Sequence, residues 1–203
     1  MANTYFGIDI SLYNTITDWS LLSSSINFCY VKASQGRTEN SGLASPLTPF
    51  TDRAASQNVA QANVHRIRTG AYHVLTARTV QESRTEAKFF INFLNNHRSS
   101  LSLAPAIDVE SVHLPTNTTA LTNVVDNFIQ VMKSNGYEPI VYTSPNWLKN
   151  RFSLLRGSKL WLAQWGKTMP SSKDFPSFYL WQYGTVKLPG VKGEVDANIM
   201  VSN

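Results

Sequence analysis

The sequence of 203 residues predicts an irregular α/β barrel, and three observations lead to this prediction. Eight short apolar segments have the length of β-strands. Stretches with helical periodicity separate the earlier segments, which is typical of parallel strands joined by helices. Only short turns separate the last segments, so helices are missing there. Eight strands close naturally into a barrel, and we expect a TIM-like barrel without helices after its later strands.

The expected strands follow one another along the whole chain. They cover residues 5–10, 27–34, 71–75, 104–111, 139–143, 160–164, 179–183 and 194–199. Asp9 lies on the face of the first strand opposite Ile8 and Ile10, because side chains alternate along a strand. An acid at this position could also simply cap the polar turn that follows.

Four helices are expected between the strands. They cover residues 51–68, 79–97, 118–135 and 144–148. The first three have an apolar stripe at helical spacing. Gly70 and Gly136 are expected to mark the ends of the first and third helices, and Thr79 with Glu82 fits a capping box at the start of the second.

Composition and charge bound the domain organisation and the partners. The length and the absence of a polar linker predict one domain, residues 1–203. Eighteen Lys and Arg against 13 Asp and Glu give a net charge of +5, which favours anionic partners. No nucleic-acid motif accompanies this charge, so nucleic acid is the weaker choice and an acidic polymer such as a bacterial wall is equally compatible. The commonest explanation of such a net charge is an excess of basic side chains scattered over the surface, without any binding partner.

Cysteine content and the N-terminal residues bear on localisation. Cys29 lies in an apolar run and is expected to be a buried thiol, so the protein needs no oxidising compartment. Residues 1–5 lack the basic and apolar segments of a signal peptide, and no run approaches the roughly 18 apolar residues of a membrane span. We therefore expect a chain made in soluble form, without export signal or membrane insertion.

Two carboxylates stand two residues apart at the end of the fourth expected strand. Asp108 and Glu110 would project from one face, with Cβ atoms roughly 6.5 to 7 Å apart. Paired carboxyl groups at this scale are typical of glycosidases, although Asp-Val-Glu also occurs often by chance. Functional groups of β/α barrels gather at the carboxyl ends of strands. Asp9 and Asp196 lie near the ends of the first and eighth strands, so we expect all four acids at one site.

Other candidates are aromatic or polar residues near the same strand ends. The aromatic ones are Tyr72, Tyr142, Trp161, Trp165 and Trp181. Each could stack on a sugar ring or fill the barrel, with packing slightly favoured. Lys32 is unusual in a buried strand and is expected to pair within the acidic cluster. His73 is expected to be a satisfied core histidine, since no second His or Cys stands at metal spacing, and we expect no metal or cofactor.

Eight short motifs occur in a fixed order along the chain. They are GIDIS (7–11), VKASQG (31–36), GAYH (70–73), IDVE (107–110), PIVYT (139–143), LWLA (160–163), WQY (181–183) and VDAN (195–198). Together they resemble the glycoside hydrolase family 25 muramidases, the Chalaropsis-type lysozymes, over residues 5–200. Each motif is weak alone, but eight in this order at plausible spacing form a strong signal.

The resemblance implies a flattened, incomplete barrel that hydrolyses the β-1,4 bond between N-acetylmuramic acid and N-acetylglucosamine in peptidoglycan. It places the family's acidic set on Asp9, Asp108, Glu110 and Asp196, with Glu110 as the proton donor to the leaving oxygen. Gln182 joins Lys32 and four of the aromatic candidates, Tyr72, Tyr142, Trp161 and Trp181, as an expected substrate-binding residue.

The chemistry of these roles can be argued separately. A general acid needs a raised pKa, which neighbouring carboxylates and partial burial supply. Two parallel side chains of one strand are poorly arranged for attack from the opposite face, so we expect the substrate's own 2-acetamido group to attack, with net retention. Asp108 would orient or stabilise the oxazolinium intermediate. Asp9 and Asp196 would orient groups, and either could activate water.

Two other functions remain open at this point. One is a non-catalytic glycan-binding module, against which the four intact acids argue, and the other is a hydrolase of chitin-like polymers. Without a signal peptide, a phage endolysin held in the host cytoplasm before lysis is the simplest biology, and a bacterial autolysin cloned without its leader is the alternative. No wall-binding repeat follows residue 200. The sequence does not indicate the host, the tolerated peptide stems or the oligomeric state.

Overall fold

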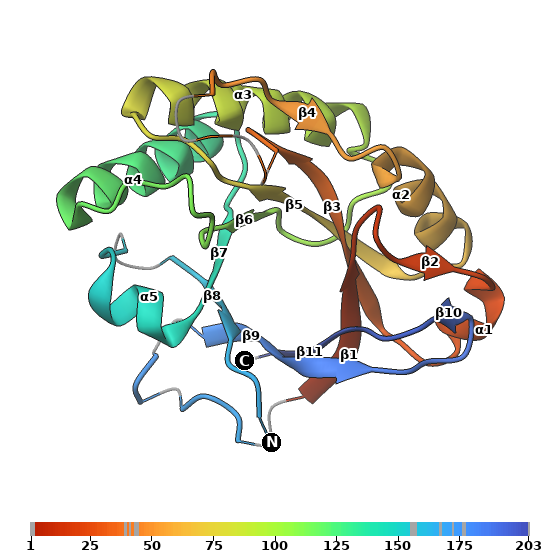
Figure 1. Ribbon diagram of the computed structural model, residues 1–203. Helices are drawn as coiled ribbons and strands as arrows, with labels where there is room; N and C mark the ends of the chain where they lie inside the picture. The colour runs from red at the N-terminus through yellow and green to blue at the C-terminus, as the bar shows by residue number, and fades with distance from the viewer. Residues whose placement is uncertain are drawn as a thin grey trace.

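The computed structural model describes residues 3–38, 40, 42, 45–154, 158–166, 168–171, 173–175 and 178–202. Eight strands form its central barrel (Figure 1). They are β1 (Asn3–Ile10), β3 (Phe28–Gln35), β5 (Arg68–Val74), β6 (Ala106–Asp108), β7 (Ile140–Thr143), β8 (Leu160–Ala163), β9 (Phe178–Val186) and β11 (Val195–Ser202). Their order around the ring is β1-β11-β9-β8-β7-β6-β5-β3, and pairing of β3 with β1 closes it. The expected irregular α/β barrel is therefore confirmed.

Strand direction separates β11 from the rest of the barrel. Seven strands are parallel to their neighbours, as expected, whereas β11 runs antiparallel to both β1 and β9. The connection from β9 to β11 covers only residues 187–194. That length is too short for the crossover that a parallel neighbour requires, so the chain turns back on itself.

Three further strands lie outside the ring and have only two residues each. β4 (Phe50–Thr51) pairs with the end of β3, and β2 (Thr15–Ile16) pairs with β10 (Val191–Lys192). Segments of this length carry no periodicity that a sequence could reveal, and none of them was expected.

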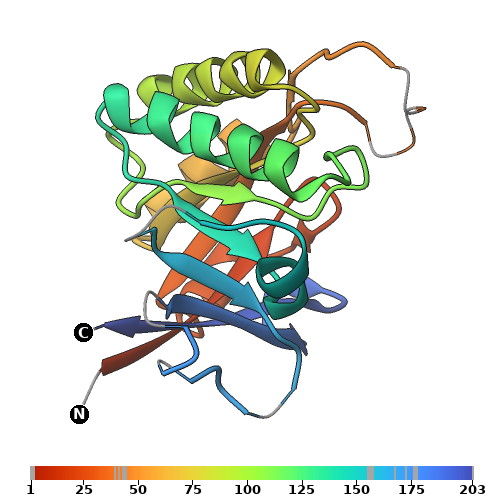
Figure 2. The same cartoon turned by 90° about the vertical axis from the view of Figure 1, so that its left-hand side faces the viewer.

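Helices cover one side of the barrel. They are α1 (Trp19–Ser23), α2 (Ala55–Val64), α3 (Val80–Asn96), α4 (Thr118–Ser134) and α5 (Pro145–Asn150). Figures 1 and 2 show α3 and α4 side by side over the part of the barrel that contains β5, β6 and β7, with α2 beside β3. On the side formed by β9, β11 and β1, no helix of the described chain is drawn over the sheet. This asymmetry matches the helices that the sequence lacks after its later strands.

The first long helix ends earlier than expected. α2 stops at Val64, and Arg68 and Gly70 already belong to β5, so the prediction of a helix over 51–68 with Gly70 at its end is wrong. Gly70 instead leaves room for a neighbouring side chain, because a Cβ atom there would lie 2.4 Å from the ring of Tyr30. A glycine in this strand lets the buried aromatic ring pack directly on the backbone.

The other helix boundaries agree with the sequence signals. Thr79 caps α3 by accepting a hydrogen bond from the Glu82 amide, while the Glu82 carboxylate accepts from the Arg78 amide instead of the Thr79 amide of a full capping box. Gly136 follows α4 with φ +81°, the left-handed conformation that ends many helices.

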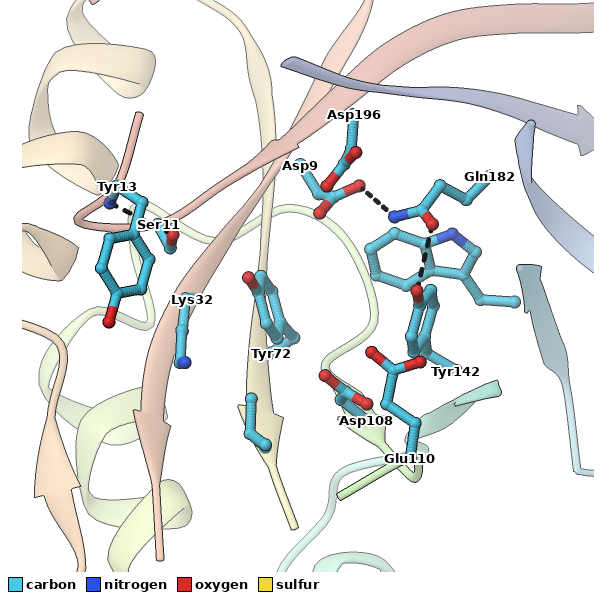
Figure 3. A pocket seen from close by; sticks show the side chains of 12 residues that line it. Asp9, Ser11, Tyr13, Lys32, Tyr72, Asp108, Glu110, Tyr142, Gln182 and Asp196 are labelled. Carbon is cyan, nitrogen blue, oxygen red and sulfur yellow. Dashed lines mark hydrogen bonds between the residues drawn. The ribbon is translucent and has the colours of Figure 1, made fainter. Parts of the chain in front are cut away.

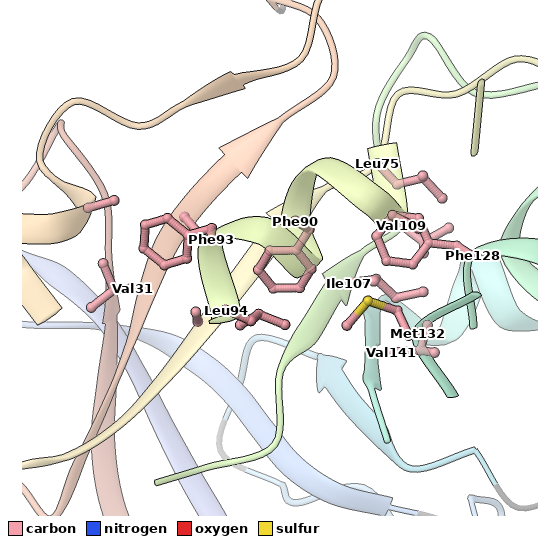
Figure 4. Packing of buried hydrophobic residues seen from close by; sticks show 14 of the residues in the cluster. Val31, Leu75, Phe90, Phe93, Leu94, Ile107, Val109, Phe128, Met132 and Val141 are labelled. Atoms are coloured by element: carbon pink, nitrogen blue, oxygen red, sulfur yellow. The ribbon is translucent and has the colours of Figure 1, made fainter. Parts of the chain in front are cut away.

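The core has two layers. One fills the barrel with side chains such as Phe28, Tyr30 and Trp161, and the other lies between barrel and helices. Figure 4 shows the second layer, where Phe90 of α3 and Phe128 of α4 pack near residues of β3, β6 and β7. Each fully buried side chain of this size contributes roughly 1.5 to 3 kcal/mol. Cys29 is fully buried in the same layer, as expected.

Candidate active site

A pocket opens at the carboxyl ends of the parallel strands (Figure 3). It holds about 610 Å³ of empty space, including solvent at its open mouth. We call it the acid pocket, and it is lined by Asp9, Ser11, Tyr13, Lys32, Tyr72, Val74, Asp108, Glu110, Tyr142, Trp161, Gln182 and Asp196. The four acids that the sequence singled out therefore meet in one place.

Asp9 and Asp196 face each other across neighbouring strands. They are directly paired in the antiparallel register of β1 and β11, where opposite Cβ atoms are about 4.5 to 5.5 Å apart. Asp196 stands at the start of β11, not at a carboxyl end, and reaches the pocket only because this strand is antiparallel. Burial, followed by the charge of Asp196, raises the pKa of Asp9 to about 7. Burial also raises the pKa of the half-buried Asp196.

Two amide side chains hold Asp9 in place. Its Oδ2 atom accepts hydrogen bonds from Asn198 Nδ2 at 2.8 Å and from Gln182 Nε2 at 3.0 Å. Both bonds favour the charged form and lower the pKa of Asp9, against the effects of burial and of Asp196. Asp9 is only 8% exposed, so these bonds replace most of the water that a carboxylate would otherwise bind.

Asp108 and Glu110 occupy the opposite wall. Asp108 is the last residue of β6 and is buried, whereas Glu110 lies beyond the strand and is exposed. The expected strand over 104–111 is thus shortened to three residues, and the partial burial expected for Glu110 is absent. Both acids also line a second cavity, which they share with Val74, Ser111 and Val112. The Asp108/Glu110 pair consequently stands at the junction of two adjoining cavities.

Two tyrosines lie between the acids. Tyr142 is surrounded by all four carboxylates, and after burial their charges, with Glu110 first, raise the pKa of its hydroxyl. The hydroxyl donates a hydrogen bond to Gln182 Oε1 at 3.0 Å. Burial, followed by the charges of Asp9 and Asp108, likewise raises the pKa of Tyr72 well above its usual value. Both side chains therefore stay protonated and can serve as hydrogen-bond donors.

A match to a known protein family shows what kind of protein contains these acids. The sequence model of Glycosyl hydrolases family 25 matches residues 8–191. The chain belongs to this family. The matched range includes Asp9, Asp108 and Glu110 but ends before Asp196, which the β1–β11 register alone brings to the site.

Solved structures with a similar fold include an autolysin, a spore cortex lytic enzyme and the catalytic domain of an endolysin. The modular autolysin LytC from Streptococcus pneumoniae, in complex with a synthetic peptidoglycan ligand, is 20% identical, with a TM-score of 0.79. The spore cortex lytic enzyme SleM of Clostridium perfringens is 22% identical with a TM-score of 0.82, and the catalytic domain of endolysin ply40 from Listeria monocytogenes bacteriophage P40 is 20% identical with a TM-score of 0.76. At these identities the likeness shows a shared fold.

The chain accounts for different shares of these proteins. Between 97% and 99% of it aligns with the three structures, but it spans 46% of LytC, 67% of SleM and 94% of the ply40 domain. The chain is thus about half as long as the modular autolysin that it matches. No protein with a curated function matches it in sequence.

Lys32 departs from the expectation for this family 25 site. It is 7% exposed and lines the acid pocket. The described part of the chain contains three ion pairs, Arg37–Glu82, His73–Glu86 and Lys133–Glu138, and none of them involves Lys32. The expected pairing within the acidic cluster is therefore wrong. The register explains this, because β5 separates Lys32 from Asp108 and because Lys32 lies two residues beyond the neighbour of Asp9 on β3.

Two of the three tryptophan candidates, Trp161 and Trp181, occupy different sides of the sheet. Trp161 forms the floor of the acid pocket, is 2% exposed and packs against Tyr30, Tyr72 and Tyr142. Trp181 does not reach this pocket, and it lines a separate cavity on the outer face of the barrel. Since neighbouring side chains alternate along β9, the inward position of Gln182 turns Trp181 outward. The structure therefore does not bring Trp181 together with the other expected substrate-binding residues.

His73 is a satisfied core histidine, as expected. It is fully buried, and its ring nitrogens lie 2.8 Å from Ser34 Oγ and 2.7 Å from Glu86 Oε2. Glu86 also accepts hydrogen bonds from the Thr76 amide and hydroxyl. This chain of bonds lies outside the acid pocket and serves the packing of α3 on β3 and β5.

Several residues of the site were missed in the sequence. Asn198 follows Asp196 by two residues in a strand, and this spacing could have placed both near Asp9. Tyr13 lines the mouth of the pocket and is 81% exposed. Asp52 is buried and accepts a hydrogen bond from the Leu12 amide, which fixes the loop after Asp9. No local pattern identifies that contact, because 40 residues separate the two partners.

Within the described residues, no three His, Cys, Asp or Glu side chains are arranged to hold a metal ion. Among the helices that the structure describes, none combines the length and the apolar character needed to cross a membrane.

Proposed function

We propose that the chain is a muramidase that hydrolyses the β-1,4 bond between N-acetylmuramic acid and N-acetylglucosamine of peptidoglycan. Membership of family 25 supports a glycoside hydrolase, and the four acids of the pocket supply the groups that this chemistry requires. Peptidoglycan as substrate is supported by the autolysin LytC, which was solved with a synthetic peptidoglycan ligand.

The observation that carries the proposal is the position of Glu110 between two cavities. Asp108 and Glu110 line both the acid pocket and the cavity formed with Ser111 and Val112. A glycan that crosses this junction has its scissile bond at the pair. The sugar that develops positive charge lies in the acid pocket, where carboxylates stabilise it, and the leaving sugar lies in the second cavity.

The proposed reaction proceeds in two steps. Glu110 gives its proton to the leaving oxygen while the carbonyl oxygen of the substrate's 2-acetamido group attacks the anomeric carbon, so the glycosidic bond breaks and an oxazolinium ion forms. Asp108 stabilises that cation and orients the acetamido group. Water then attacks the anomeric carbon, Glu110 takes up its proton, and the acetamido group is restored with net retention.

Release of reducing ends from purified peptidoglycan tests this proposal. We expect Glu110→Gln to lower the rate by roughly 10² to 10⁴, the usual contribution of a general acid. Glu138→Gln is the matched control, since this exposed residue precedes β7 at the opposite end of the strands and forms a surface ion pair with Lys133. The control is expected to cleave like the wild type. Equal rates for Glu110→Gln and the wild type would overturn the role of Glu110.

Three further outcomes separate the alternatives. Binding of peptidoglycan without any release of reducing ends supports a glycan-binding module. Faster cleavage of chitin oligosaccharides than of peptidoglycan supports a chitin-like substrate. Inversion at the anomeric carbon, detected by NMR of the first products, contradicts the substrate-assisted route.

The biological setting is part of the same proposal. We infer that the 203 residues act as one catalytic domain on the bacterial cell wall, as an endolysin made in the host cytoplasm or as an autolysin. The fold shared with the ply40 endolysin domain and with LytC is compatible with either origin.

A further inference from the structure

Two tryptophan–amide pairs converge on one oxygen of Asp9. Trp161 Nε1 donates to Asn198 Oδ1 at 2.8 Å, and the amide of Asn198 donates to Asp9 Oδ2. In the same way Trp165 Nε1 donates to Gln182 Oε1 at 3.2 Å, and the amide of Gln182 donates to Asp9 Oδ2. The two pairs have the same chemistry and reach the carboxylate from different strands.

The pairs differ in their exposure. Trp161 is 2% exposed inside the barrel, whereas Trp165 is 63% exposed on the connection between β8 and β9. Backbone hydrogen bonds extend the pairing of these strands past Trp165, because the Gln164 and Gly166 amides donate to the carbonyls of Gln182 and Tyr183. The indole N–H is thus held beside Gln182 although the ring reaches solvent.

Trp165 is the partner that determines which way the Gln182 amide points. The Tyr142 hydroxyl can donate to an amide oxygen or accept from an amide nitrogen, and the Asp9 carboxyl can accept when ionised or donate when protonated. An indole N–H can only donate. Among the partners that the structure describes for this amide, Trp165 alone therefore excludes the flipped orientation, in which Oε1 would face Asp9.

We propose that Trp165 is a positioning residue of the active site, whose indole N–H fixes the Gln182 amide so that two amide donors hold the Asp9 carboxylate. Only the importance of this arrangement for hydrolysis rests on the proposed function. The positioning itself depends on the described hydrogen bonds alone.

Loss of the indole N–H has a definite electrostatic consequence. A flipped Gln182 presents an acceptor to Asp9, which favours the protonated acid, and one of the two bonds that stabilise the carboxylate is lost. The pKa of Asp9, already raised to about 7 by burial and by Asp196, then rises further. The other titratable groups that interact with Asp9 or line its pocket are Asp196, Glu110, Asp108, Tyr72, Tyr142, Tyr13, Lys32 and the buried Cys29.

NMR titration of the Asp9 carboxyl carbon tests the proposal without any need for turnover. Asp9 and Asp196 interact, so both carboxyl carbons are followed, with Asp9→Asn used for assignment. We expect the Asp9 titration midpoint of Trp165→Phe to lie about one pH unit higher than that of the wild type. Replacement of Trp165 by 3-benzothienylalanine, which keeps the bicyclic shape without the N–H, is expected to give the same shift.

The same substitution made in a Gln182→Met variant separates the positioning role of Trp165 from general structural damage. In Gln182→Met there is no amide to orient, so Trp165→Phe is expected to add no further shift. An unchanged midpoint in Trp165→Phe, or an equal shift with and without Gln182, would overturn the proposal.

Activity provides an independent readout. If the muramidase proposal holds, the limb of the pH–rate profile that reports Asp9 moves by the same amount as the NMR midpoint. A shifted titration in a protein that does not cleave peptidoglycan refutes the proposed function and leaves the positioning role intact.

Discussion

The site contains two pairs of acids that are built in opposite ways. Asp108 and Glu110 are two residues apart and follow a single short strand, with one side chain buried and the other exposed at the junction of two cavities. Asp9 and Asp196 come from the two ends of the chain and meet through strand register. The first pair is a local feature at the junction through which the proposed glycan path runs. The second exists only in the closed barrel.

The surroundings of the two pairs also differ, because contacts from several distant segments fix Asp9. Asp9 is held by amides that are themselves held by indole N–H groups, so its orientation and its pKa are set by residues of β8, β9, β11 and the connection after β8. This side of the barrel has no helix over it among the described residues. In the proposed mechanism the local pair supplies the reactive groups, and the distant pair supplies their electrostatic environment.

The largest expected effect is on kcat, and it tests this division of roles through one substitution in each pair of acids. We expect Asp108→Asn to lower kcat by roughly 10² to 10³, because it acts on the charge that develops in the transition state. Asp196→Asn is expected to lower kcat only about tenfold, or about 1.4 kcal/mol, because it acts through Asp9. Initial rates of reducing-end release at saturating peptidoglycan measure both. Equal losses in kcat would contradict the division of roles.

Asp9→Asn is expected to stabilise the fold at pH 8 by about 1 to 3 kcal/mol while it impairs activity. The pKa of Asp9 is about 7 in the folded protein and 3.8 without the protein's influence, so the folded state binds the extra proton between these values. The stability that this proton provides is fully present below pH 3.8 and is lost as the pH rises to 7. Asparagine does not titrate and avoids this loss.

Urea unfolding of both proteins at pH 4 and pH 8 measures the effect. The advantage of Asp9→Asn should be present at pH 8 and nearly absent at pH 4. Asp174→Asn, at an exposed position, is the matched control and should show no such pH dependence. A gain of the same size at both pH values would mean that the charge of Asp9 is not its cause.

The smallest effect on activity is expected for Trp181→Phe. Trp181 donates to the Gln164 carbonyl at 2.7 Å outside the acid pocket, so the substitution should cost about 1 kcal/mol of stability and change kcat/KM by less than about twofold. Trp161→Phe is the matched variant on the inner face, and it should reduce activity more because it releases Asn198. If Trp181→Phe cleaves more slowly than Trp161→Phe, the placement of the two rings is contradicted.

Much of the barrel could be predicted from the sequence because its signals are local. The apolar stripe of α4, the cap at Thr79 and the glycine at 136 are each decided within a few residues. The same is true of Asp108 and Glu110, whose spacing and position after an apolar run already indicated their chemistry. The motif order then pointed to the family that the comparison showed.

The rest depended on contacts between distant segments. The sequence does not encode the direction of β11 in any local pattern, so Asp196 was placed at a strand end for the wrong reason. Lys32 lacks the expected ion pair among the described residues, and Trp181 lies outside the acid pocket, because strand register and inward or outward orientation, not residue type, decide what each side chain faces. The roles of Asn198 and Trp165 follow from hydrogen bonds between segments that no periodicity links.

The closure of the ring by β11 also sets the order in which the enzyme is assembled. Asp9 leaves the ribosome well before its partner in register, Asp196. A growing chain can fold the helix-covered strands early, but it cannot close the barrel or form the Asp9–Asp196 pair until β11 has emerged. Nascent chains that have not reached β11 therefore lack a complete site, and cutting activity begins only once this strand has joined the ring.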